Sequence, residues 1–138
     1  MIAARQGRTH NVYLSLPTTA HIRFCNYFAG CQVLIYPGAF NLTTGPLHWE
    51  LLQRSRAVDN QVFVSMCSPA RDMTAGYHAW GHSMTVDPMG SVLAEAGEGE
   101  ELIFVTIDPE VLQSTRANIP VTVQRRFDVY PDVSQSLN

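Results

Sequence analysis

Residues 30–67 read GCQVLIYPGAFNLTTGPLHWELLQRSRAVDNQVFVSMC and predict two buried strands joined by a helix. The apolar, β-branched run 31–36 is typical of a strand buried on both faces. Thr43 or Thr44 can cap a following helix that has Pro46 in its first turn and ends near Asn60. Apolar or small residues recur along it at three- and four-residue spacing, which predicts one amphipathic helix: Leu47, Leu51, Leu52, Ser55 and Val58.

The second buried strand follows at 62–66, so that 30–67 forms a parallel strand–helix–strand unit. Polar and apolar residues alternate over 82–87, and Asp87-Pro88-Met89-Gly90 predicts a tight turn. A partner strand at 91–96 and a further strand at 102–107 then complete a predicted antiparallel meander. Asp108 and Pro109 start a last helix that ends before Pro120. Upstream, 11–16 alternates weakly and could form a strand. We therefore expect an α/β fold, a mixed sheet with its helices on one side.

The amino-acid composition favours a globular protein and argues against a nucleic-acid-binding or membrane-spanning one. A chain of 138 residues, 46% hydrophobic and 15% charged, suits a single globular domain. A net charge of −3 argues against nucleic acid as a partner, and no apolar run approaches the roughly 18 residues of a membrane helix. The three cysteines are too few for a disulfide scaffold, which favours a reducing, cytoplasmic setting. The acid-free opening with Arg5, Arg8 and Arg23 leaves a mitochondrial location as the alternative.

Lysine is missing from the chain. The nine basic residues are all arginines: Arg5, Arg8, Arg23, Arg54, Arg56, Arg71, Arg116, Arg125 and Arg126. This composition excludes mechanisms in which these 138 residues supply an ε-amine, such as a Schiff base or a lysine general base.

The stretch 30–67, SPARD at 68–72 and GHSMTVDPMGSVLAEAG at 81–97 together resemble the C-terminal half of the nitrilase superfamily of carbon–nitrogen hydrolases, and within it the omega-amidases. The resemblance divides the chain into a non-matching segment 1–29, the C-terminal half of a hydrolase domain at 30–131, and a tail at 132–138. It implies a partial αββα sandwich, a homodimer, no cofactor and no metal. The implied substrates are small dicarboxylic acid monoamides of the 2-oxoglutaramate and 2-oxosuccinamate type.

The resemblance also implies a catalytic triad of glutamate, lysine and cysteine, which this chain cannot complete. Its cysteine belongs in a Cys-Tyr-Asp-x-Arg-Phe elbow, where this sequence has Thr19 to Phe24 with only the final Arg-Phe retained. We therefore predict no catalytic residue and an inactive chain. The alternatives are a non-catalytic fragment that binds full-length subunits, or a product of truncation by splicing or by the gene model.

Two substrate-binding residues follow from the resemblance. Arg23 aligns with the arginine that binds the substrate's carboxylate, a role that suits a guanidinium fork, and Phe40 aligns with a pocket-lining aromatic.

The other cysteines, histidines and charged residues are expected to have structural roles. Cys25, Cys31 and Cys67 are expected to pack, and His78 and His82 lack the helix that a zinc pair would need. The acidic run 95–101 is expected to form a solvated hairpin tip, and Arg125 and Arg126 to serve the dimer.

Overall fold

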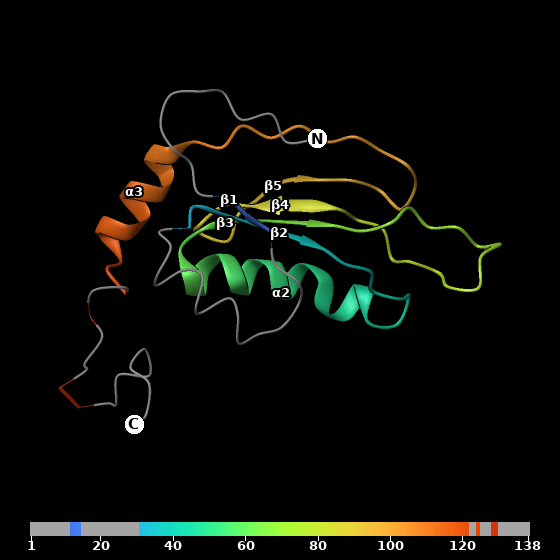
Figure 1. Ribbon diagram of the computed structural model, residues 1–138, viewed down its shortest axis with the longest axis horizontal. Helices are drawn as coiled ribbons and strands as arrows, with labels where there is room; N and C mark the ends of the chain where they lie inside the picture. The colour runs from blue at the N-terminus through green and yellow to red at the C-terminus, as the bar shows by residue number, and fades with distance from the viewer. Residues whose placement is uncertain (1–11, 15–30, 122–123, 125–127, 130–138) are drawn as a thin grey trace.

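Strands β2 (Val33–Pro37) and β3 (Phe63–Cys67) form the parallel centre of a five-stranded sheet in the computed structural model (Figure 1). The structure describes residues 12–14, 31–121, 124 and 128–129. Within them the strand order is β1-β2-β3-β4-β5, with β1 at Val12–Leu14, β4 at Met84–Val86 and β5 at Val92–Glu95. The pairs β1/β2 and β2/β3 are parallel, while β3/β4 and β4/β5 are antiparallel. The mixed α/β sheet, its strand–helix–strand unit and the antiparallel run β3-β4-β5 are thus confirmed.

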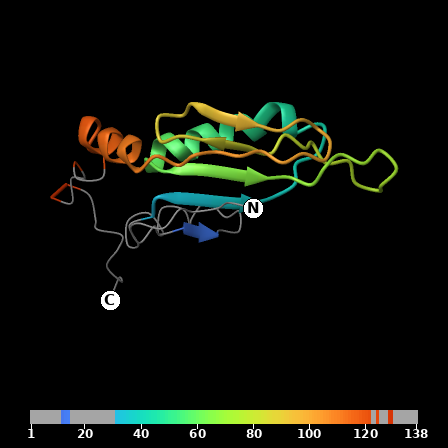
Figure 2. The same ribbon diagram turned by 90° about the horizontal axis from the view of Figure 1, so that it is seen from above.

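Helix α2 (Gly45–Asn60) covers one face of this sheet (Figures 1 and 2). Its predicted buried side is wrong. Leu47, Leu51 and Val58 are 62%, 62% and 49% exposed, and the helix instead buries Gly45, Trp49, Gln53 and Ala57. The indole of Trp49 contributes more apolar area than either leucine, and the small Ala57 lets the helix approach the sheet.

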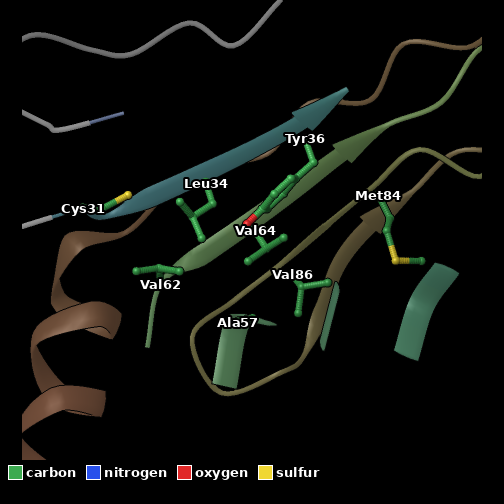
Figure 3. Close-up of a cluster of buried hydrophobic side chains, with 8 residues drawn as sticks. All are labelled: Cys31, Leu34, Tyr36, Ala57, Val62, Val64, Met84 and Val86. Atoms are coloured by element: carbon green, nitrogen blue, oxygen red, sulfur yellow. The ribbon is translucent and has the colours of Figure 1, made fainter. Parts of the chain in front are cut away.

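The main core lies between α2 and the sheet. Figure 3 shows its eight side chains, which come from β2, α2, β3 and β4 and the residues that precede β2 and β3: Cys31, Leu34, Tyr36, Ala57, Val62, Val64, Met84 and Val86. Because successive strand residues point to opposite faces, Leu34 and Val64 contact α2 while Val33 and Phe63 face the other way.

Helix α3 (Pro109–Asn118) packs on that opposite face, so the expectation of helices on one side is wrong. Its Leu112 joins Val33 and Phe63 in a second, smaller cluster. Asp108 caps the helix as predicted, because its side chain accepts a hydrogen bond from the Glu110 backbone N–H. At α2, Thr44 occupies the N-cap position as predicted, but its side chain accepts no capping hydrogen bond. The Asn41 Oδ1 atom accepts the backbone N–H groups of Thr43 and Thr44 just before the helix.

Residues 102–107 form no strand, so the last strand expected for the meander is wrong. Their exposure alternates along the chain as in a strand, yet they pair with no strand in the part of the chain that the structure describes. Local propensity favours an extended conformation, but a ladder also needs a partner strand. No helix among the described residues is long and apolar enough to cross a membrane.

Candidate functional site

The loops that follow β2 and β3 lie side by side at the carboxyl ends of these parallel strands, where ligand sites of open α/β sheets occur. The Gly38 N–H donates to the carbonyl of Cys67 at 2.9 Å, which joins the two strand ends. Farther out, Asn41 and Ala79 form an isolated antiparallel bridge, and the Trp80 N–H donates to the carbonyl of Phe40 at 2.7 Å. Residues 38–44 and 68–83 are therefore held together as one edge.

Arg71 connects this edge to the loop after β5. Its guanidinium donates to the carbonyls of Ala79 (3.3 Å) and Trp80 (2.8 Å) and forms an ion pair with Glu98. The same group lies over the Trp80 ring at 5.1 Å, and the Arg71 backbone N–H donates to the carbonyl of Glu98 at 2.7 Å. The Arg71 side chain is only 17% exposed. One arginine thus fixes the position of two separate loops.

His82 occupies the next position on the edge, with a backbone φ of +55°. Its Nδ1 atom lies 2.9 Å from a carboxylate oxygen of Glu95, and its ring stacks on Trp80 with centroids 4.5 Å apart. Its carbonyl accepts the Trp49 indole N–H at 2.5 Å. These three contacts, from α2, from β5 and from Trp80 in the loop, hold the imidazole and its backbone in place.

Close packing explains two glycines, Gly81 on the edge and Gly45 at the start of α2. A Cβ on Gly81, whose φ is +78°, would lie 2.8 Å from the Cα of Glu98. A Cβ on Gly45 would overlap the Trp80 ring. The loops could not come this close with larger residues at these positions.

A shallow depression lies beside Arg71 and His82, between the loops that follow β3 and β5. Its walls combine small residues, one imidazole and two carboxylates: Ser68, Pro69, Ala70, Gly81, His82, Ser83, Ala96, Gly97, Gly99, Glu100 and Glu101. One carboxylate is already engaged, because Glu101 accepts the Gly97 backbone N–H at 2.8 Å. The acidic run is therefore bonded to its surroundings at Glu95, Glu98 and Glu101, which is more order than the expected solvated tip.

Of the two predicted substrate-binding residues, Phe40 lies on this edge. Its half-buried ring meets Trp49 edge to face, with centroids 5.2 Å apart and an interplanar angle of 68°. Arg23, together with Thr19 and Cys25, falls outside the described residues, as do Arg125 and Arg126. The substrate-binding roles of Arg23 and Phe40 stay predictions.

The cysteines and histidines differ from one another in their surroundings. Cys31 is fully buried as expected, whereas Cys67 is exposed, so its predicted packing role is wrong. Cys67 is the last residue of β3, where the strand leaves the sheet. No three histidine, cysteine or carboxylate side chains gather closely enough to hold a metal ion within the described ranges.

Asp72 has the one perturbed carboxyl pKa resolved among the described residues. A hydrogen bond from the Thr74 hydroxyl, followed by one from the Thr74 backbone N–H, lowers the Asp72 pKa below its ordinary value of 3.8. Both bonds stabilise the carboxylate form. They close the exposed turn at residues 72–75, which lies next to Arg71 on the loop.

Sequence reasoning missed the set formed by Arg71, Trp80 and Glu98. The only signal was the SPARD motif, which contains Arg71 and was used for the resemblance without a role for the individual residue. Glu98 is 27 residues from Arg71, and only the folded chain shows that they form an ion pair.

The profile of the family described as "Carbon-nitrogen hydrolase" matches residues 20–117. The chain is 63% identical to the omega-amidase NIT3 of Saccharomyces cerevisiae over 105 residues. This matched segment covers 76% of this chain and 36% of that protein. Over 101 residues it is 62% identical to the human omega-amidase NIT2, covering 73% and 37%. The chain thus spans little more than a third of the length of these two relatives.

Solved structures agree with this similarity. The crystal structure of Saccharomyces cerevisiae Nit3, a member of branch 10 of the nitrilase superfamily, matches with a TM-score of 0.74 and 51% identity, covering 84% of this chain and 44% of that one. The NitFhit protein of C. elegans matches with a TM-score of 0.74 and 35% identity, covering 86% and 30%.

Proposed function

The chain belongs to the carbon–nitrogen hydrolase family, and from this premise we propose that it contains one half of an omega-amidase site. The proposed half-site binds small dicarboxylic acid monoamides of the 2-oxoglutaramate type, and these 138 residues alone do not hydrolyse them. The observation that supports this proposal most strongly is the joined pair of loops at the carboxyl ends of β2 and β3. They fix Phe40 at the edge where the sequence motifs of the family lie.

The proposed binding roles follow from the chemistry of the substrate. Arg23 would bind the substrate's carboxylate through two parallel hydrogen bonds, which a guanidinium can form and a point charge cannot. Phe40 would contact the methylene carbons between the carboxylate and the amide. Trp49 contacts the Phe40 ring edge to face, with the two ring centroids 5.2 Å apart.

Hydrolysis requires groups that these residues lack. A cysteine thiolate adds to the amide carbonyl, the amide nitrogen takes up a proton and leaves as ammonia, and water then cleaves the thioester to acid and free thiol. A general base must accept the thiol proton, and a positioned cation or N–H group must stabilise the oxyanion. The chain has no lysine, and Thr19 stands at the position of the nucleophile. One lost oxyanion donor alone typically costs about 3–4 kcal/mol of transition-state stabilisation.

A graft tests the proposed half-site. Residues 30–131 of this chain replace the matching segment of the yeast relative, which retains its own remaining residues, and ammonia release from 2-oxoglutaramate is measured. We expect turnover by the graft. A correctly folded graft without turnover would contradict the proposed half-site.

A matched pair of variants tests Phe40 within the graft. Phe40→Ala should raise KM by about tenfold with little change in kcat, since a missing apolar pocket contact costs about 1–3 kcal/mol. Leu47→Ala, on the exposed side of α2, should change neither constant. Equal effects of the two substitutions would refute the pocket role of Phe40.

A second candidate function is non-catalytic association with full-length subunits or with a second copy. Three exposed apolar side chains on the outer side of α2 favour it, Leu47, Leu51 and Val58. Such stripes on a helix often mark protein interfaces. Sedimentation of the chain with and without the yeast relative tests this candidate. A monomer that stays unchanged in both mixtures would count against it.

A further inference from the structure

Residues 77–80, which we call the strap, run antiparallel to residues 39–41 at the edge that carries Phe40. An isolated antiparallel bridge joins the two segments, and the Trp80 N–H donates to the carbonyl of Phe40 at 2.7 Å. The strap belongs to the loop that follows β3, which projects beyond the sheet (Figures 1 and 2). A segment that is distant in sequence thus holds the backbone of the predicted pocket residue.

Tyr77 adds a side-chain hydrogen bond to the strap. Its hydroxyl donates at 3.2 Å to the carbonyl of Ala39, the residue directly before Phe40. The Tyr77 side chain is 51% exposed, so water is an alternative partner for the hydroxyl and the bond adds little to the stability of the fold. Its main consequence is geometric, because it restrains the peptide group that leads into Phe40.

Phe40 is restrained on both sides of its Cα atom. Because peptide groups are planar, the carbonyl of Ala39 shares a plane with the Phe40 N–H, and the carbonyl of Phe40 belongs to the plane that follows. Tyr77 binds the first carbonyl and the Trp80 N–H binds the second. Two fixed peptide planes set the direction of the Cα–Cβ bond, and with it the place from which the Phe40 ring projects.

The Phe40 ring has a support of its own in the core. It meets Trp49 edge to face at 5.2 Å, and Trp49 is 1% exposed with its indole N–H bonded to the carbonyl of His82. Substitution of Trp49 would disturb the core, and the bond from Trp80 comes from the backbone. Tyr77 is therefore the restraint that a side-chain substitution can remove while the core stays intact.

We infer that Tyr77 is a positioning residue of the proposed half-site, whose hydroxyl holds the Phe40 ring in place for the methylene carbons of a dicarboxylic acid monoamide. The inference rests on the proposed function, since it needs Phe40 in the pocket. Tyr77 acts through Phe40 and does not touch the substrate. An apolar contact of this kind is equal in the ground state and the transition state, so a looser ring raises KM and leaves kcat unchanged.

Hydrogen exchange tests the restraint in the full 138-residue chain. Tyr77→Phe removes one hydroxyl and keeps the ring. The Trp80 amide, which donates to the Phe40 carbonyl, should then exchange about fivefold faster, the effect of one ordinary hydrogen bond lost from the strap. Thr74→Val is the matched control, because it opens the turn at 72–75 of the same loop and keeps the Tyr77 hydroxyl. No acceleration in Tyr77→Phe, or equal acceleration in both variants, would overturn the inference.

A double-mutant cycle tests the positional role in the graft of this chain onto the yeast relative. Tyr77→Phe should raise KM for 2-oxoglutaramate about threefold with kcat unchanged, a smaller effect than the loss of about tenfold expected when the Phe40 ring is removed. In the Phe40→Ala graft the same substitution should change neither constant, because the side chain that it positions is missing. Thr74→Val should leave KM unchanged, and the circular dichroism of each variant should match that of the parent.

The outcomes separate this inference from the proposed half-site. A folded parent graft without turnover contradicts the half-site, and the role of Tyr77 is then refuted with it. Turnover by the parent graft with a KM that Tyr77→Phe does not change contradicts the inference alone. A rise in KM that persists undiminished in the Phe40→Ala graft would also overturn it, because Tyr77 would then act independently of the ring.

Discussion

Replacing Arg71 by methionine should destabilise the fold by about 3 kcal/mol, since Arg71 joins two loops through several contacts. Each hydrogen bond to the carbonyls of Ala79 and Trp80 contributes on the order of 1 kcal/mol. The contact with the Trp80 ring adds about 0.5–1 kcal/mol, and the ion pair to the 65% exposed Glu98 adds no more than about 1 kcal/mol. Methionine retains most of the apolar stem, so that the loss comes from the guanidinium.

Arg56→Met is the matched control. Arg56 forms one ion pair, at 3.8 Å from the 63% exposed Asp59 on the same helix, and its loss should change stability by less than about 0.5 kcal/mol. Arg71→Lys should recover about 1 kcal/mol, because one ammonium keeps the charge but cannot reach both carbonyls and the carboxylate.

Urea unfolding measures these differences. Tryptophan fluorescence combines Trp49 in the core with Trp80 in the loops, where the Trp80 ring contacts both Arg71 and His82, and far-UV circular dichroism reports the whole fold. Both signals should give a lower unfolding midpoint for Arg71→Met. If Arg71→Met destabilises the chain no more than Arg56→Met, the role assigned to this arginine is wrong.

Three further substitutions test other contacts. Gly45→Ala should cost about 1–3 kcal/mol in urea unfolding, because the added methyl group overlaps the Trp80 ring; unchanged stability would show that the ring moves away freely. Asp108→Ala should cost about 1 kcal/mol and reduce the helicity of α3 in NMR chemical shifts, since it removes the N-cap; a fully helical first turn in the variant would argue against the cap. Thr74→Val should raise the lowered Asp72 pKa toward 3.8 in an NMR titration, because it removes the principal hydrogen bond to the carboxylate; an unmoved pKa would exclude that cause. The parent Asp72 stabilises the fold fully above its unfolded pKa, and this contribution is lost as the pH falls through the lower folded pKa.

The residues around α2 show what the sequence could predict. Thr44, Pro46 and Asn60 gave the helix its correct limits, because capping and proline chemistry are local. The spacing of Leu47, Leu51 and Val58 gave the wrong buried face. The true face includes Gln53, whose amide is satisfied in the core: it donates to the carbonyl of Met84 and accepts from the Trp49 indole, both at 3.1 Å in the orientation that suits its neighbours.

The segment 102–107 shows the limit of local propensity. Its β-branched residues and alternation predicted a strand, and the exposure of its side chains does alternate, but no strand forms. A strand also needs a neighbour, and pairing depends on chain segments that a local pattern does not contain. Residues 102–107 can therefore have the sequence pattern of a strand without forming one among the described residues.

The candidate site could be predicted only in part. Family motifs proposed a pocket role for Phe40, which stays a prediction, and its place just after the carboxyl end of β2 followed from the parallel pairing of β2 with β3. The linkage of Arg71 to Trp80 and Glu98 could not be predicted, since each residue type is ordinary in a surface loop. Their role arises from separations that only tertiary structure closes.

Ammonia release from 2-oxoglutaramate by the purified 138-residue chain tests whether family membership brings activity with it. The yeast omega-amidase serves as the positive control. We predict release no faster than the buffer blank, since these residues supply neither a lysine ammonium nor a cysteine at the position of the nucleophile. Turnover at about 1 s⁻¹ or faster, within the usual range of enzymes, would contradict the proposal.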